Sequence, residues 1–229
     1  MKENMKLMKE EVLMDLEIFT DASIKTYQSG RTFGCSGAIC STTGESIYTI
    51  NPDTTNNRSE LIAIDIGVRL AHGIYNREPQ KYDNIYLYSD SQFGIFGLTK
   101  WIYGWSKNMK DGIMYGSNKQ PVKNQELFIG ILNYLSMNNF KINFRHQAGH
   151  INVTRPKMLF DANEIFKRSN GYYLKPEDIY KISYYNDFVD KSTRAKLENI
   201  NPNDFPVLNN ANKNMLNISL AKDFKKYIV

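Results

Sequence analysis

Residues 54–61 of the chain read TTNNRSEL, and residues 62–74 continue as IAIDIGVRLAHGI. Apolar side chains recur near helical spacing from Leu61 to Leu70, and Glu60 stands where the first turn of such a helix would lie. This stretch therefore predicts an amphipathic helix that opens with an acidic residue after a polar connection.

Three β-rich runs precede this helix. Leu16–Thr20 (LEIFT) ends at Asp21, and the runs Gly34–Cys40 and Ser46–Ile50 are separated by the turn-like STTGE. The last two runs are typical of a β-hairpin. The region before the helix is therefore expected to supply three strands.

Strands and helices alternate after the helix. The apolar run Ile85–Ser89 (IYLYS) ends at Asp90 and is typical of a buried strand. The elements expected next are a helical region from Gln92 to Trp105, a basic loop over 107–123, a helix over Gln125–Met137, a strand over Lys141–Arg145 and a helix beginning near Phe160. The order β-β-β-α-β-α-α-β-α favours an α/β protein with a mixed sheet and helices packed against it.

The composition is that of an ordinary globular protein, because 41% of the 229 residues are hydrophobic and 23% are charged. The formal charge of +5 fits a nucleic-acid partner without establishing one. The apolar stretch 61–68 is interrupted by Asp65 and is too short to span a membrane, and the first residues lack the apolar core of a signal peptide. We therefore expect an intracellular, cytoplasmic protein with no membrane partner.

The cysteines and histidines do not predict a metal site of their own. Cys35 and Cys40 stand five apart in one expected strand, so their side chains point to opposite faces and a disulfide between them is not expected. Two cysteines and three histidines are too few for a zinc site built from such ligands. Any bound metal is therefore expected to be held by carboxylates.

Four acidic residues stand where side chains can reach open space. Asp21 and Asp90 follow expected strands, Glu60 opens the first helix, and Asp161 stands near the start of the last helix of the domain. Three or four converging carboxylates can hold two magnesium ions for an in-line phosphoryl displacement. Taken singly, each acid is more typical of a solvated charge or of a helix N-terminus.

The residues around the first three acids resemble successive motifs of type 1 ribonuclease H: LEIFTDAS around Asp21, TTNNRSEL around Glu60 and YSDSQF around Asp90. WIYGWSKN, followed by PVKNQEL, resembles the basic protrusion of that family and the helix after it. The resemblance covers about Leu16 to Lys167. It implies a ribonuclease H-like fold whose five-stranded sheet has three antiparallel strands followed by two parallel ones.

The resemblance also implies roles for the matching positions. Asp21, Glu60, Asp90 and Asp161 would bind metal and carry the catalysis. The residues expected to contact nucleic acid are Asn57 and Arg58 in the minor groove, Thr55 and Asn124 at a phosphate of the DNA strand, Trp101 and Trp105 along the DNA channel, and the protrusion lysines Lys107, Lys110, Lys119 and Lys123. Helix packing explains the two tryptophans equally well, and a solubilising loop would carry similar lysines.

The loop after the fifth strand departs from the family pattern. An alignment on AGH (148–150) places Gln147 where the family has a mobile histidine. Either His146 or His150 could take that catalytic role, and we choose His150 because it lies further out in the loop.

The fourth acid is the second departure. The spacing from AGH to Asp161 is four residues longer than in the bacterial pattern, and the usual Asn-Glu pair before the acid is missing. Glu164 is the only nearby carboxylate that could replace Asp161.

The resemblance suggests three parts of the chain: an N-terminal leader (1–15), a ribonuclease H-like catalytic domain (16–170) and a C-terminal extension of unknown role (171–229). The extension is rich in Asn, Lys and Tyr, and we expect it to be partly helical around Pro176–Tyr184.

The function implied is an endoribonuclease that hydrolyses the RNA strand of RNA–DNA hybrids by two-metal-ion catalysis and leaves 5′-phosphate and 3′-hydroxyl ends. The hybrid duplex would be its partner and two Mg²⁺ ions its cofactor, although Mn²⁺ also accepts oxygen ligands. Two alternatives stay open: a DNA-cutting resolvase or transposase on the same fold, and a catalytically silent hybrid-binding module. Asn57, Arg58 and the basic protrusion favour the hybrid-cutting enzyme.

Overall fold

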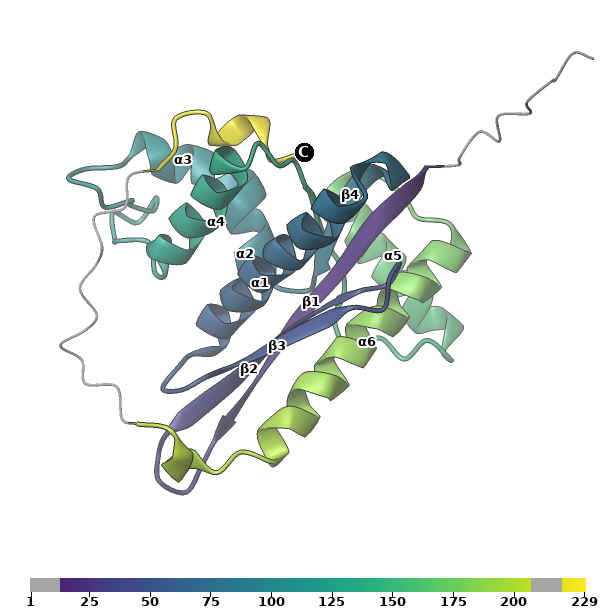
Figure 1. Cartoon of the computed structure of the whole chain (residues 1–229), viewed down its shortest axis with the longest axis horizontal. Coiled ribbons are helices and arrows are strands. Elements are labelled where there is room, and N and C mark those ends of the chain that lie inside the picture. Colours follow the sequence, from purple (N-terminus) through teal and green to yellow (C-terminus); the bar gives the residue numbers. More distant parts are fainter. Residues whose placement is uncertain (1–12, 207–219) are drawn as a thin grey trace, which may run out of the picture.

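The computed structural model describes residues 13–206 and 220–229 and contains a twisted five-stranded sheet with helices on both faces (Figure 1). The strands are β1 (Met14–Thr26), β2 (Thr32–Cys40), β3 (Ser46–Asn51), β4 (Tyr82–Ser89) and β5 (Asn143–His146), in the order β3-β2-β1-β4-β5. β1, β2 and β3 pair antiparallel, whereas β1, β4 and β5 pair parallel. The predicted mixed sheet is confirmed.

The central strand β1 is longer than the sequence predicted. Its parallel pairing with β4 ends at Thr20 opposite Ser89, but its antiparallel pairing with β2 continues to Thr26. The prediction that the first strand ends at Asp21 is therefore wrong, because hydrogen bonds to β2 carry the strand onward. Asp21 lies in the middle of β1, one residue past the end of the β4 pairing.

Helix α1 (Asn56–Arg77) begins at Asn56, and Thr55 is its N-cap. Glu60 therefore lies in the second helical turn, and the prediction that placed it in the first turn is wrong. The reason is that the hydroxyl of Thr55 accepts the backbone N–H of Arg58 and starts the helix earlier. The buried residues Leu61, Ile64 and Val68 pack against the sheet.

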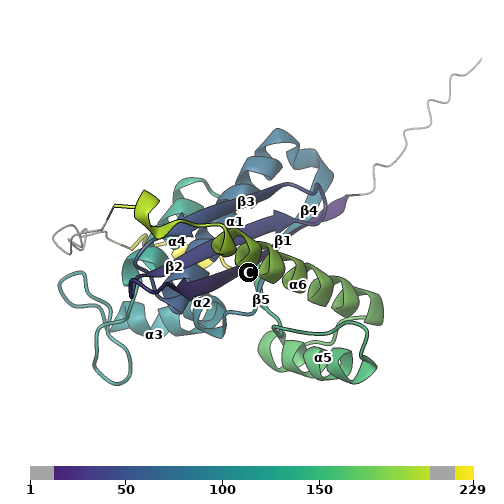
Figure 2. The same cartoon turned by 90° about the horizontal axis from the view of Figure 1, so that it is seen from below.

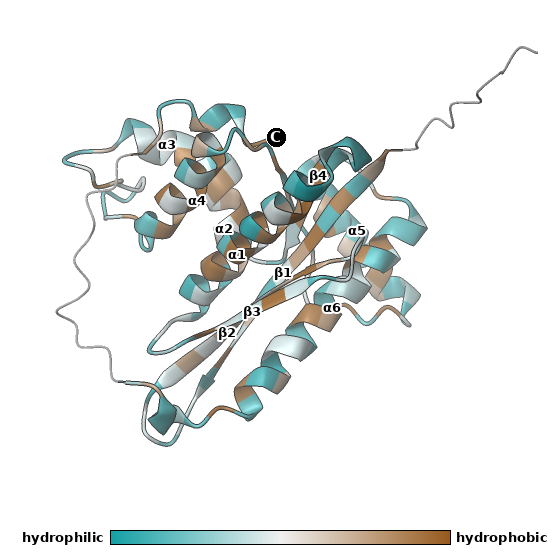
Figure 3. Ribbon diagram, viewed as in Figure 1, coloured by the Kyte–Doolittle hydropathy of each residue, from teal (hydrophilic) through white to brown (hydrophobic). Residues whose placement is uncertain are grey.

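The helices after β4 share the α1 face of the sheet. They are α2 (Gln92–Phe96), a π-helical turn (Gly97–Trp101), α3 (Ile102–Lys107) and α4 (Gln125–Met137), and α4 has the bounds that the sequence predicted. Figure 3 shows hydrophobic residues along β1 and on parts of α1 and α4. Residues of these elements form the larger of the hydrophobic cores, between the sheet and these helices. The loop 107–123 extends away from the sheet (Figure 2).

The opposite face of the sheet is covered by α6 (Pro176–Glu198), which runs along β1 and β2 (Figure 2). Its Ile182 and Val189 pack with Phe19 and Tyr88 of the sheet in a second core. The helix is much longer than the stretch 176–184 predicted from sequence, because its apolar side chains are stabilised by the sheet rather than by local propensity.

Helix α5 (Pro156–Asn170) lies between β5 and α6 in the chain. It begins at Pro156 rather than near Phe160, because proline is favoured in the first turn of a helix. Residues 220–229 return to the far edge of the sheet, where Phe224 and Tyr227 enter the larger core and the Val229 N–H donates to the carbonyl of Ile142 at 3.2 Å.

Both cysteines, Cys35 and Cys40, are free and buried, as expected. Within the described ranges 13–206 and 220–229, no helix is long and apolar enough to cross a membrane.

Candidate metal centre and nucleic-acid interface

Three carboxylates from separate elements meet beside the centre of the sheet. Asp21 of β1, Glu60 of α1 and Asp90 directly after β4 each offer an oxygen, and these oxygens lie within 4.8 Å of one another. Asp21 and Asp90 become neighbours because the parallel pairing of β1 with β4 stops one residue before each of them. The early start of α1 brings Glu60 over the same point.

Burial and mutual repulsion favour the protonated form of these carboxylates when no cation is bound. Burial, followed by the charges of Asp90 and Asp190, raises the pKa of Asp21 to about 8. Burial and then Asp21 raise the pKa of Glu60 well above its ordinary value, and burial raises that of Asp90.

Two buried carboxylate oxygens, Asp21 Oδ2 and Glu60 Oε2, have no hydrogen-bond partner among the described residues. Buried oxygens of this kind are unfavourable unless a donor or a cation satisfies them. The donor set consists of hard oxygen ligands, so the residues present fit Mg²⁺ or a similar divalent cation.

A fourth acid, Asp190 of α6, lines the same cavity of about 310 Å³ as Asp21, Glu60 and Asp90. Its carboxylate accepts a hydrogen bond from Arg194 Nε at 2.8 Å and lies 3.4 Å from His150 Nδ1. Asp190 is not among the site residues predicted from sequence, because it lies within the extension 171–229.

A signal for Asp190 was present in the sequence. The pair Asn186–Asp187 stands shortly before it, which is the kind of Asn-acid pair that is missing before Asp161. Asn186, Asp190 and Arg194 are also four residues apart, so they share one face of a helix.

The structure does not bring Asp161 to this cluster. Its half-exposed carboxylate pairs with Lys157 at 2.9 Å on the surface of α5, and Glu164 accepts the hydroxyl of Tyr173 at 2.7 Å. Neither acid lines the cavity that holds Asp21. Asp161 lies on α5, whereas the helix that follows it, α6, carries Asp190.

The loop after β5 places His150, rather than His146, at the cavity. The His150 imidazole is exposed. His146 is buried, and its Nδ1 lies 2.8 Å from the hydroxyl of Ser169. Gln147 is also buried and donates to Asn186 Oδ1 at 2.5 Å, while Asn186 Nδ2 donates to Asp90 Oδ2 at 3.4 Å. These bonds connect the loop, α6 and the carboxylate cluster.

Gly149 packs directly against Asp90. A Cβ atom at position 149 would lie 2.1 Å from Asp90 Oδ2 and 3.0 Å from its Cγ. Only glycine fits here without displacing the carboxylate.

The predicted phosphate and minor-groove residues gather at the start of α1. The guanidinium of Arg58 donates to Asn124 Oδ1 at 3.3 Å and also pairs with Glu126. Asn57 and the N-cap Thr55 are exposed beside it. The structure therefore brings Arg58 and Asn124 together, although they are far apart in the sequence.

The two tryptophans differ in their surroundings. Their ring centroids lie 5.8 Å apart, and Trp105 also packs edge-on against Phe128. Trp101 remains 40% exposed, so it keeps a surface for a ligand while Trp105 contributes to the core. Lys107, Lys110 and Lys119 line a hollow in the loop that follows, and Lys123 is exposed near its end.

This strand order and the three carboxylates where β1 and β4 part define the ribonuclease H-like class of α/β proteins. The chain belongs to the RNase H family, whose model matches residues 14–162. The match ends before α6, so Asp190 lies outside it.

Relatives named as ribonuclease H match less than half of the chain. Ribonuclease HI of Haemophilus influenzae is 40% identical over 97 residues, which cover 42% of this chain and 54% of that protein. Ribonuclease H of Rickettsia massiliae is 32% identical over 110 residues, or 48% of this chain and 63% of that protein. The chain thus spans less than two thirds of the length of these relatives.

A solved type 1 ribonuclease H with the type 2 active-site motif has a TM-score of 0.45 and 18% identity, over 72% of this chain and 80% of that chain.

Proposed function

We propose that this protein is an endoribonuclease that hydrolyses the RNA strand of RNA–DNA hybrids and leaves 5′-phosphate and 3′-hydroxyl ends. The observation that carries the proposal is the group of three converging carboxylates, two of them buried with unpartnered oxygens, in a member of the RNase H family. Relatives that match the chain are named ribonuclease H.

Asp21, Glu60 and Asp90 would hold two Mg²⁺ ions, and Mn²⁺ would fit the same oxygens. The ions would supply activation of a water molecule and stabilisation of charge on the leaving oxygen. We assign the fourth carboxylate to Asp190 in place of Asp161, because Asp190 lines the cavity and Asp161 pairs with Lys157. His150 would accept or donate a proton, and its position in the lining of the cavity supports this role.

The substrate would lie across the start of α1 and the protrusion. Thr55, Asn57, Arg58 and Asn124 would contact the backbone and minor groove, where the 2′-hydroxyl distinguishes RNA from DNA. Trp101 and the protrusion lysines would contact the DNA strand, with Trp105 supporting Trp101.

We also propose that the catalytic domain extends through α6, beyond the boundary at residue 170. Its support is the packing of α6 on the sheet and the position of Asp190. A cytoplasmic location stays a prediction from the sequence.

The test uses four labelled duplexes: RNA–DNA hybrid, RNA–RNA, DNA–DNA, and DNA that contains a short RNA stretch. Each is incubated with the full chain in magnesium or in chelator, beside the variant Asp90→Asn. We expect metal-dependent cutting of RNA only where it pairs with DNA, and loss of cutting in the variant. End-labelling of the products checks the 5′-phosphate.

Two other results would contradict the proposal. Cutting of plain DNA would indicate the resolvase-like alternative. Salt-sensitive binding of the hybrid without cutting would indicate the silent binding module.

A further inference from the structure

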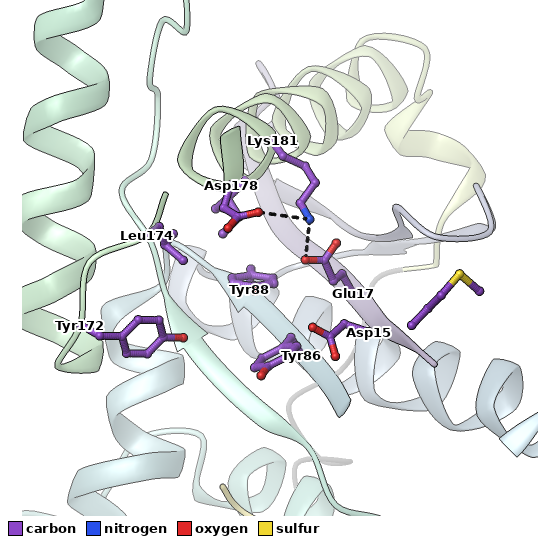
Figure 4. Close-up of a pocket in the computed structure, with 10 residues that line it drawn as sticks. Asp15, Glu17, Tyr86, Tyr88, Tyr172, Leu174, Asp178 and Lys181 are labelled. Atoms are coloured by element: carbon purple, nitrogen blue, oxygen red, sulfur yellow. Dashed lines mark hydrogen bonds and ion pairs between the residues drawn. The ribbon is translucent and has the colours of Figure 1, made fainter. Parts of the chain in front are cut away.

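A second cavity, of about 420 Å³, lies between the start of β1 and the first half of α6 (Figure 4). Its walls come from β1, β4, the first half of α6 and the segment before α6. Phe19, stacked between Tyr88 and Tyr185, lies on β1 between Glu17 of this cavity and Asp21 of the metal centre. The proposed nuclease function makes no use of this cavity.

The charges lining the cavity favour a cation. Asp15, Glu17 and Asp178 contribute three negative charges and Lys181 one positive charge, so the lining carries a formal charge of −2 in a chain whose total is +5. Lys181 Nζ lies 2.9 Å from Glu17 and 3.9 Å from Asp178 and neutralises them only in part (Figure 4). A phosphate group would be repelled here.

Aromatic rings complete the lining. Tyr86, Tyr88 and Tyr172 all face the cavity, and aromatic faces attract organic cations. Figure 4 shows the hydroxyl of Tyr172 directed towards Tyr86 and Tyr88, and this hydroxyl accepts a hydrogen bond from Arg145 Nε at 3.3 Å.

The hydroxyl of Tyr88 is a further sign of a ligand. Tyr88 is only 5% exposed, yet its hydroxyl has no hydrogen-bond partner among the described residues. Burial and then the charge of Glu17 raise the pKa of Tyr88, so the hydroxyl stays neutral and its oxygen can accept a hydrogen bond from an N–H donor.

We propose that this cavity binds an organic cation with an ammonium or guanidinium group, held by Glu17 and Asp178 and by the tyrosine rings. The cation is either a free small amine or the side chain of a lysine or arginine on a protein partner. The ammonium group of Lys181 occupies part of the cavity and competes with the ligand for Glu17 and Asp178.

Two probes distinguish the sources: methylguanidinium, and arginine blocked at both ends as a mimic of a protein side chain. Binding to the full chain is followed by titration of the tyrosine signals in NMR spectra. Glu17→Gln is expected to weaken binding about fivefold, and Lys181→Met to strengthen it about fivefold, because they remove a partner and a competitor of the cation. Asp65→Asn, on α1 across the sheet, is the matched control and should change nothing.

Opposite effects of the two variants support the proposal. Binding of both probes indicates a general cation site, whereas binding of the blocked arginine alone indicates a protein side chain. Absence of binding by both probes overturns the proposal, and so does binding that Glu17→Gln and Lys181→Met leave unchanged. Circular dichroism of each variant verifies the fold.

Discussion

The hydroxyl groups of Ser23 and Thr193 lie 2.8 Å apart and join β1 to α6 just beyond Asp21 and Asp190. Gly37 of β2, which has no side chain, lets the helix come this close, because a Cβ atom there would lie 2.8 Å from Thr193 Cγ2. A helix outside the family match is thus fixed in position beside the carboxylate cluster.

The position of Asp190 leads to the first prediction. Asp190→Asn is expected to reduce the rate of hybrid cleavage by on the order of 10- to 100-fold, because the cavity would lose the carboxylate that we propose as the fourth metal or water ligand. Asp161→Asn is the matched control and should cleave at the unmodified rate. Equal cleavage rates for the two variants would contradict the assignment of Asp190 as the fourth carboxylate.

The packing of α6 on the sheet leads to the second prediction. Ile182→Ala removes a buried side chain and is expected to lower the free energy of unfolding by about 2–5 kcal/mol in urea titrations. Tyr180→Ala, at an exposed position two residues earlier on the other side of α6, should change it by less than about 0.5 kcal/mol. If Ile182→Ala left the free energy of unfolding unchanged, α6 would not be part of the cooperatively folded unit.

The contact of Gly149 with Asp90 leads to the third prediction. Gly149→Ala would place a methyl group against the carboxylate and displace it, so cleavage should fall by more than about tenfold. Gly73→Ala, where a Cβ meets no atom within 4 Å, is the control. Measurements at high magnesium concentration test whether weakened metal binding is the cause, since excess metal should then restore part of the activity.

The raised pKa of Asp21 gives a prediction about pH. The unfolded chain loses this proton near pH 3.8, whereas the folded, metal-free protein keeps it to about pH 8. The folded state binds more protons between these values, so the stability of the metal-free protein should fall as the pH rises through this window. Thermal unfolding in chelator at pH 5 and pH 8 measures the slope.

Magnesium should raise the Tm more at pH 8 than at pH 5, because the cation binds the ionised carboxylates. Asp21→Asn should flatten the slope in chelator. A Tm that does not change with pH in chelator would be inconsistent with buried, uncompensated carboxylates.

Local patterns predicted much of the fold. The β-rich runs gave the five strands, and apolar periodicity gave α4 with its observed bounds. The motifs around Asp21, Glu60 and Asp90 named three residues that the structure brings together. These features depend on residues close in the chain, which explains why sequence alone revealed them.

The features that sequence reasoning missed depend on partners far away in the chain. Pairing with β2 extends β1 past Asp21, and the sheet stabilises α6, whose own pattern is weak. Asp161 lies near the start of α5, as expected for the fourth acid, but its carboxylate pairs with Lys157 and does not line the cavity. The pair Asn186–Asp187 was a sequence signal for Asp190, but the packing of α6 on β1 was needed to show that Asp190 reaches the cavity.

The docking of the chain end beside Ile142 also affects how the protein meets its neighbours. An uncovered outer strand offers unpaired N–H and C=O groups to other molecules and invites edge-to-edge aggregation. On β5 these groups are occupied at both ends: Tyr227 and Val229 bond to Ile142, and the side chain of Asn170 bonds to the N–H and carbonyl of His146. Loss of the last ten residues would remove two aromatic side chains from the core and leave backbone groups at this edge of the sheet unpaired. We therefore expect aggregation, rather than lower activity, as the first effect in a shortened chain.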